Sequence, residues 1–280
     1  MKPAPFDYAR PSSLADAIAL LASEERIAKP LAGGQSLGPM LNLRLAQPEV
    51  LVDITAVPDL RRAEGDDDGV LIGACVTHAD IEDGRVPDPT DGALPAVARA
   101  IAYRAVRNRG TIGGSLAHAD PAADWISALA ALGAEAIVRG PAGQRRLPVE
   151  RFMAGAFEAA LAPGELLEAI RVPRLSPRRR WGFYKFCRKA GEYAHAIGAV
   201  LFDPDRAVCR AVIGATEATP VVLGDTDAES LFGGRPEDLA GSFDRGCAAK
   251  LLEEREIRDP FERQIHIVAL ERAVRLASGS

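Results

Sequence analysis

The first 175 residues alternate between short apolar runs typical of strands and segments with helical spacing. A helix is expected after Ser13, because Leu14, Ala17, Ile18 and Leu21 recur on one face. Strands are expected at 27–31, 50–54, 70–74 and 166–172, with acidic and glycine-rich hairpin tips at 64–69 and 140–143. Helices are expected at 37–45, interrupted by Pro39, at 94–103, and from Asp120-Pro121, read as N-cap and first helical residue, to Leu132.

The pattern changes after a proline- and arginine-rich linker at 173–180. Strand-like stretches follow one another at 181–188, 196–202 and 208–214, and the chain turns helical after Asp225. The last element is an amphipathic helix at 261–277. Strands followed by helices indicate an α+β unit, so the chain divides into segments of about 1–55, 56–175 and 178–280.

Composition narrows the class of protein. The 280 residues are 48% hydrophobic and 26% charged, and the net charge of −5 argues against a nucleic-acid-binding surface. No apolar run reaches the length of a membrane span, and the N-terminus lacks the apolar core of a signal peptide. The four cysteines are scattered without a C-x-x-C pair, which argues against zinc or iron–sulfur ligation and fits buried thiols in a reducing cytosol.

Two glycine-rich runs carry the candidate chemistry. They are Ala32-Gly33-Gly34-Gln35-Ser36 and Thr111-Ile112-Gly113-Gly114-Ser115, and each lies between a β-rich and a helical stretch. Adjacent glycines allow close backbone approach and can point N–H groups at an anion, such as the diphosphate of a dinucleotide. Neither G-x-G-x-x-G nor G-x-x-x-x-G-K-[ST] occurs at these runs, so a Rossmann or P-loop site is disfavoured, and ligand-free strand–helix turns are the alternative.

In their longer context the runs resemble a known family. The segments 29–37 and 109–124 are similar to the two FAD loops of the medium subunit of molybdenum hydroxylases, the xanthine dehydrogenase and carbon monoxide dehydrogenase family. The resemblance continues through Phe6-Asp7-Tyr8 with Pro11, the segment 163–167, and Tyr184-Lys185-Phe186 with Arg188-Lys189. It therefore covers essentially the whole chain in the family's order.

The resemblance implies an α+β fold of the PCMH or vanillyl-alcohol-oxidase type. Subdomains of about 1–55 and 56–175 would form an FAD-binding domain, 1–175. A C-terminal domain, 178–280, would contribute an antiparallel sheet and helices, as in carbon monoxide dehydrogenase flavoproteins. FAD would be held non-covalently between the subdomains.

The resemblance also assigns cofactor contacts. Both loops would contact the FAD diphosphate. Asp124 would contact a ribityl or ribose hydroxyl, and Leu167 would lie against the flavin region. Lys185 would lie near the isoalloxazine ring, and Tyr193 would cover the face of that ring. Without the family, Asp124 would be a helix first-turn carboxylate, Leu167 a core residue, Lys185 a solvated lysine and Tyr193 a half-buried sheet tyrosine. No catalytic or metal-ligating residue is assigned, and His118 and His195 are given no proton chemistry. The complete set of expected FAD contacts is Leu31, Ala32, Gly33, Gly34, Gln35, Ser36, Leu37, Thr111, Ile112, Gly113, Gly114, Ser115, Asp124, Leu167, Lys185 and Tyr193.

The function implied is electron transfer. FAD on this chain would receive electrons from [2Fe–2S] clusters on a small partner subunit, while substrate is oxidised at molybdopterin on a large one. The expected assembly is a cytoplasmic heterotrimer, often dimerised, without nucleic acid or a membrane span. Two other interpretations stay open: a stand-alone FAD oxidase of a small alcohol or phenol, and a non-catalytic nucleotide-binding assembly module.

Overall fold

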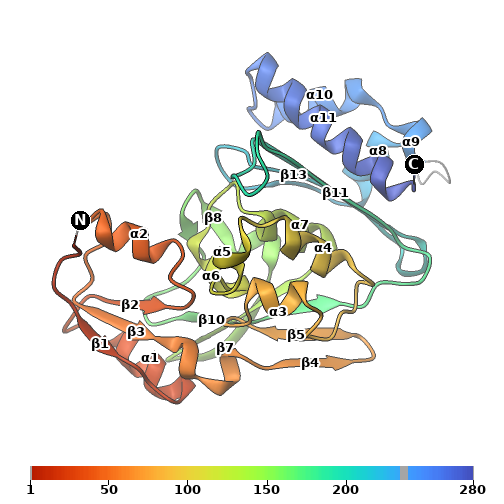
Figure 1. Ribbon diagram of the computed structural model, residues 1–280. Coiled ribbons are helices and arrows are strands. Elements are labelled where there is room, and N and C mark those ends of the chain that lie inside the picture. Colours follow the sequence, from red (N-terminus) through yellow and green to blue (C-terminus); the bar gives the residue numbers. More distant parts are fainter. Residues whose placement is uncertain (1, 234–238, 280) are drawn as a thin grey trace.

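The N-terminal part of the chain forms a small parallel sheet in the order β1-β3-β2 (Figure 1). The computed structural model describes residues 2–233 and 239–279. Ser13 caps the first helix, because its Oγ accepts a hydrogen bond from the Asp16 backbone N–H at 3.1 Å. The elements of this unit are β1 (Asp7–Ala9), α1 (Leu14–Ala22), β2 (Ala28–Leu31), α2 (Leu37–Asn42), β3 (Val50–Asp53), and the 3-10 turns Ile54–Ala56 and Pro58–Leu60.

A five-stranded antiparallel sheet in the order β4-β5-β10-β6-β7 forms the centre of the molecule. Its middle strand β10 is almost wholly buried, which explains the near-continuous apolar run LLEAIRVP. The elements are β4 (Ala63–Asp66), β5 (Gly69–Gly73), α3 (His78–Glu82), α4 (Ala93–Ala100), α5 (Arg104–Arg107), α6 (Ile112–His118), α7 (Asp124–Leu132), β6 (Glu135–Gly140), β7 (Gly143–Pro148), the 3-10 turn Val149–Arg151, β8 (Met153–Gly155), β9 (Glu158–Ala159) and β10 (Leu166–Pro173).

The C-terminal part is a four-stranded antiparallel sheet, β11-β12-β13-β14, covered on one face by helices (Figure 1). Helix α11 lies directly on this sheet, because Gly182 and Gly198 present no side chain to it. A Cβ at these positions would lie 1.8 Å from the carbonyl oxygen of Ala273 and 2.5 Å from that of Ala269. The elements are β11 (Arg180–Phe186), β12 (Ala196–Asp203), the 3-10 turn Pro204–Arg206, β13 (Val208–Gly214), β14 (Val221–Leu223), α8 (Asp225–Leu231), α9 (Leu239–Ser242), α10 (Arg245–Glu254) and α11 (Pro260–Ala277).

Helix α7 joins the central and C-terminal sheets. All of its residues are buried. Trp125 and Leu129 pack into the core of the central sheet, whereas Ala130 and Ala131 pack against Ala199 and Val212 of the C-terminal sheet. The α+β class expected from the sequence is confirmed, and the two β-rich parts share this helix.

Three expected helix boundaries are wrong. The helix expected at 37–45 ends at Asn42. Helix α7 begins at Asp124 rather than at Asp120-Pro121, because the Asp120 carboxylate accepts the Ala122 N–H at 2.9 Å and closes a separate turn. The helix expected at 94–103 ends at Ala100, and a second short helix, α5, starts at Arg104. Between them Ala102 adopts a φ of +42°, a left-handed conformation that no glycine signals in the sequence.

Among the described residues, no helix is long and apolar enough to cross a membrane, and no group of three or more His, Cys, Asp or Glu side chains is placed to hold a metal ion. The expectation of buried thiols is confirmed for Cys75 and Cys209, while Cys187 and Cys247 are half-buried.

The buried histidines predict acid sensitivity of the fold. His266 on α11 is fully buried, and neither ring nitrogen has a hydrogen-bond partner among the described residues. Burial lowers its pKa to about 4. In the unfolded chain, where a histidine has a pKa of about 6.5, His266 is protonated at a higher pH than in the folded chain. The free energy of unfolding therefore falls as the pH drops from about 6.5 to about 4.

We predict that His266→Leu reduces the loss of unfolding free energy between pH 7.5 and pH 5.0 by about 2 kcal/mol. Urea unfolding at the two pH values measures this. His195→Leu is the matched control, because it removes an exposed imidazole instead of a buried one. Equal losses in His266→Leu and the wild-type protein would contradict the prediction.

Candidate functional site

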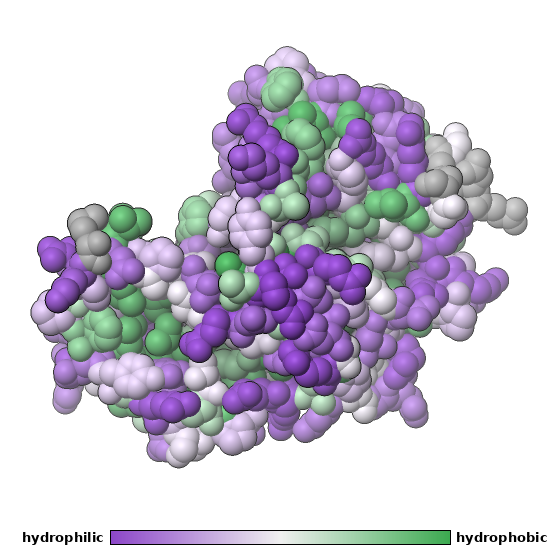
Figure 2. Space-filling model, viewed as in Figure 1, coloured by the Kyte–Doolittle hydropathy of each residue, from purple (hydrophilic) through white to green (hydrophobic). Residues whose placement is uncertain are grey.

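The structure brings the two glycine-rich runs into direct contact. The first loop lies between β2 and α2, and the second runs from α5 into α6, below a notch in the molecular outline (Figures 1 and 2). A Cβ on Gly33 would lie 2.1 Å from the carbonyl oxygen of Arg109, so only glycine permits this approach. A Cβ on Gly114 would lie 3.6 Å from that of Ala32. Runs about 80 residues apart in the sequence therefore form one surface.

The first loop presents backbone donors without acceptors. The N–H groups of residues 33–37 make no hydrogen bond within the part of the chain that the structure describes, although the loop is half-buried. Gly34 has a φ of +72°, and the αR conformation of Ser36 follows two residues later. Successive N–H groups in such a turn form a concave anion-binding site. This loop suits a phosphate or diphosphate.

The second loop uses its N–H groups differently. Those of Ile112 and Gly113 donate to the carbonyls of Val76 and Ala74, each at 3.0 Å. That of Gly114 donates to the Thr111 hydroxyl, also at 3.0 Å, so Thr111 is the N-cap of α6. The N–H groups of residues 112–115 are therefore already bonded within the chain, unlike those of the first loop, and the contact of either loop with a ligand stays a prediction. The second loop offers the Ser115 hydroxyl and close approach.

Asp124 and Lys185, expected at different parts of the ligand, form an ion pair with each other. The Lys185 Nζ lies 2.9 Å from the Asp124 Oδ2, and the side chains are 9% and 6% exposed. Burial raises the pKa of Asp124, against the opposing effect of the Lys185 charge. The other carboxylate oxygen, Oδ1, is buried without a partner in the described structure. An unpaired buried oxygen is costly, so this atom can accept a hydrogen bond from a ligand hydroxyl.

Tyr193 lies in the connection between β11 and β12, and this connection reaches back to the first loop. Partial burial and the charge of Asp120 raise the pKa of Tyr193, and the nearby Ser36 side chain opposes this shift. The tyrosine is nevertheless 63% exposed. Tyr193 therefore connects the C-terminal part of the chain with the first glycine loop.

Sequence reasoning missed the turn between α4 and α5. The Lys185 Nζ lies 3.4 Å from the carbonyl oxygen of Ala100. A Cβ on Gly191 would lie 2.9 Å from the Tyr103 ring and 3.2 Å from the Ala102 carbonyl carbon. The turn thus borders the same site as Lys185. No sequence signal marks it, because neither glycine nor proline interrupts residues 99–105.

Leu167 is placed apart from these side chains. It is 4% exposed, belongs to the core of the central sheet, and pairs with Val138 across β10 and β6. Its contact with the flavin region stays a prediction.

The histidine beside the second loop that sequence reasoning passed over is His78. It accepts a hydrogen bond from the Trp125 indole at 3.0 Å, and burial lowers its pKa to about 4. A Cβ on Gly110 would lie 2.9 Å from its ring, so this neutral histidine supports the loop from beneath.

The polar groups of the two loops and of Asp124 and Lys185 are chemically suited to hold FAD. The free N–H groups of the first loop match a diphosphate, and the unpaired Asp124 oxygen matches a sugar or ribityl hydroxyl. The Lys185 ammonium adds a positive charge on the C-terminal side.

Comparisons with known proteins agree. The family model of the FAD binding domain in molybdopterin dehydrogenase matches residues 4–175. The carbon monoxide dehydrogenase medium chain of Afipia carboxidovorans is 40% identical over 245 residues, which cover 85% of this chain and 83% of that protein. The alpha subunit of the 6-hydroxypseudooxynicotine dehydrogenase complex of Paenarthrobacter nicotinovorans is 37% identical over 234 residues, with 83% and 79% covered.

The solved structures agree with the sequence comparison. A crystal structure of the Cu,Mo-CO dehydrogenase in its cyanide-inactivated form superimposes with a TM-score of 0.86 at 32% identity, covering 100% of this chain and 99% of the other. The chain therefore belongs to the family of FAD-binding domains of molybdopterin dehydrogenases.

Proposed function

We propose that this chain passes electrons from [2Fe–2S] clusters, through its FAD, to an external acceptor. The observation that carries the proposal is the row of free N–H groups at residues 33–37, in a chain that belongs to a family of FAD-binding domains. When bound, FAD can accept electrons singly and release two, as transfer from one-electron clusters to a two-electron acceptor requires. The relatives that support this role include carbon monoxide and nicotine-derivative dehydrogenases.

The chain's own residues have separable tasks in this proposal. The first loop binds the diphosphate, and Asp124 Oδ1 accepts a hydrogen bond from a ligand hydroxyl. Lys185, held by Asp124, places a positive charge near the isoalloxazine ring, and Tyr193 covers the ring face. The nearby charge would favour the anionic reduced flavin.

Substrate oxidation belongs to other subunits in this proposal. The described part of the chain contains no metal-binding cluster of His, Cys, Asp or Glu. Molybdopterin would reside on a large partner and the clusters on a small one, in a cytoplasmic heterotrimer that dimerises. The alternative is a stand-alone FAD oxidase of a small alcohol or phenol, which would turn over substrate without partners.

The diphosphate site predicts a glycine requirement at position 34. Gly34→Ala should weaken FAD binding roughly tenfold, because an L-residue at positive φ costs about 1–2 kcal/mol and shifts the N–H groups of the loop. Gly38→Ala is the matched control, since a Cβ there meets nothing within 4 Å. Fluorescence titration of the apoprotein with FAD measures both. Equal affinities in the two variants would exclude the first loop as the diphosphate site, and FAD that stays on acid-precipitated protein would exclude non-covalent binding.

The proposed assembly predicts that the isolated chain binds FAD but does not oxidise carbon monoxide or a heteroaromatic substrate with an artificial acceptor. The reason is that substrate would be oxidised at molybdopterin on another subunit. Co-expression with the reading frames that flank its gene should restore turnover. Multiple turnovers by the isolated chain would favour the oxidase alternative.

The placement of Lys185 predicts opposite shifts of flavin potential. Lys185→Met should lower the potential, because it removes a positive charge that favours reduced flavin, by on the order of 1 kcal/mol per electron. Asp124→Asn should raise the potential, because it leaves the ammonium without its carboxylate partner. Lys250→Met on α10 is the control, as this side chain is 79% exposed and pairs only loosely with Glu254. Redox titration of the FAD-loaded variants tests this. Unchanged potentials in both site variants would show that the Lys185–Asp124 pair does not lie near the isoalloxazine ring.

A further inference from the structure

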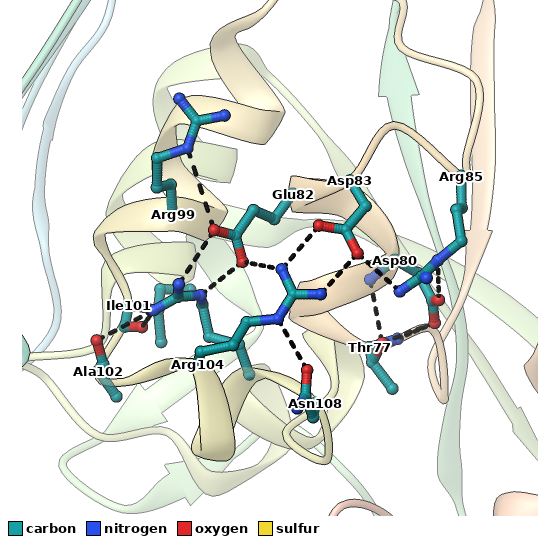
Figure 3. A network of polar contacts seen from close by, with 11 residues as sticks. Thr77, Asp80, Glu82, Asp83, Arg85, Arg99, Ile101, Ala102, Arg104 and Asn108 are labelled. Carbon is teal, nitrogen blue, oxygen red and sulfur yellow. Dashed lines mark hydrogen bonds and ion pairs between the residues drawn. The ribbon is translucent and has the colours of Figure 1, made fainter.

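Helices α3 and α5 are joined by a dense group of ion pairs on the surface beside the site (Figure 3). Figure 2 shows a hydrophilic patch over these helices. Arg104 makes two hydrogen bonds of 2.6 Å to the Asp83 carboxylate, and it also contacts Glu82 and Asn108. It is 45% exposed, so its contribution to stability is reduced by solvent.

Arg107 differs from Arg104 in burial and in its contacts. Its side chain is 10% exposed, and it forms a two-pronged pair with Glu82, with distances of 2.7 Å from Nε and 3.0 Å from Nη2. The remaining nitrogen, Nη1, donates to the carbonyl oxygens of Ile101 and Ala102 at 2.9 and 3.1 Å. The planar guanidinium thus connects α3 to the turn between α4 and α5.

That turn needs external support. Ala102 has a φ of +42°, a conformation that an L-residue adopts only when its surroundings enforce it. Arg107 binds the carbonyl oxygens of the two peptide groups on either side of the Ala102 α-carbon, those of Ile101 and Ala102. The same turn also contacts residues of the C-terminal part: Lys185 approaches the carbonyl of Ala100, and Gly191 packs on Ala102 and Tyr103.

We propose that Arg107, anchored by Glu82, is a positioning residue that fixes the turn at residues 100–103 as a wall of the flavin-ring end of the FAD site. The proposal rests on the proposed function, which places Lys185 and Tyr193 at the ring. Arg107 lies two residues before Arg109, whose carbonyl contacts Gly33. One buried guanidinium therefore connects α3 to the turn near Lys185.

The test compares two matched pairs of variants in the full chain. Arg107→Met removes the hydrogen bonds to the turn, whereas Arg104→Met removes an arginine of the same network that does not contact the turn. Glu82→Gln weakens the anchor of Arg107 together with the contacts of Glu82 to Arg104 and Arg99. Asp83→Asn changes the ion pairs of Arg104 and Arg85 and removes no hydrogen bond of Arg107. FAD affinity, the visible circular dichroism of bound flavin and urea unfolding of the apoprotein are measured for each.

We expect Arg107→Met to weaken FAD binding about tenfold or more and to change the flavin circular dichroism, with Glu82→Gln intermediate. Arg104→Met and Asp83→Asn should match wild type in both flavin measurements. Arg107→Lys should bind FAD more tightly than Arg107→Met but less tightly than wild type. An ammonium cannot pair with both oxygens of Glu82 and bind the two carbonyls of the turn at the same time.

The outcomes separate this inference from the function on which it rests. If the wild-type chain binds no FAD, the proposed function fails. If the wild-type chain binds FAD but Arg107→Met and Arg104→Met give the same affinity and spectrum, the positioning role is overturned. If Arg107→Met does not fold, the comparison of Glu82→Gln with Asp83→Asn decides: a flavin change confined to Glu82→Gln supports the role, and equal spectra overturn it.

Discussion

The buried ion pair between Asp124 and Lys185 constrains how the whole molecule is assembled. Asp124 is the first residue of α7, the helix packed against both large sheets, and Lys185 lies near the end of β11. Two charges this poorly hydrated are tolerated only together, and removing one partner of such a pair typically costs about 3–5 kcal/mol. The pair therefore sets the position of the C-terminal sheet relative to the central sheet, and with it everything that the β11–β12 connection contacts.

The position of the C-terminal sheet determines which residues meet at the site. Ile197 and Gly214 lie opposite Lys185 in the register of β11, β12 and β13, and Ser127, one turn after Asp124, packs closely against Gly214. The β11–β12 connection can then lie against Tyr103 through Gly191 and against Ser36 through Tyr193. Three segments distant in the sequence therefore meet here: the first glycine loop, the turn at residues 100–103 and the β11–β12 connection.

Much of this could be predicted from the sequence. The strands around the glycine loops, the α+β class and the two loops themselves have strong local signals: apolar runs, paired glycines and a capping serine. The division of labour between the loops has no such signal. Whether a glycine N–H faces a ligand depends on whether a distant carbonyl already accepts its hydrogen bond, as those of Ala74 and Val76 do for the second loop. The start of α7 was misplaced for a related reason, because Asp120-Pro121 is a favourable helix start whose carboxylate closes a turn instead.

The turn at 100–103 shows why the rest could not be read from the chain. Its left-handed residue is an alanine, which has no intrinsic preference for that conformation. The conformation is enforced by Arg107, and Arg107 is itself held by a carboxylate on another helix. Sequence patterns report local preference and burial, whereas this turn owes its shape to a tertiary network that overrides local preference. Without Arg107, the strained turn at residues 100–103 would relax to another conformation. With it, the turn is held rigid beside the binding site. The polar cluster of α3 and α5 is therefore better understood as support for the site than as ordinary surface charge.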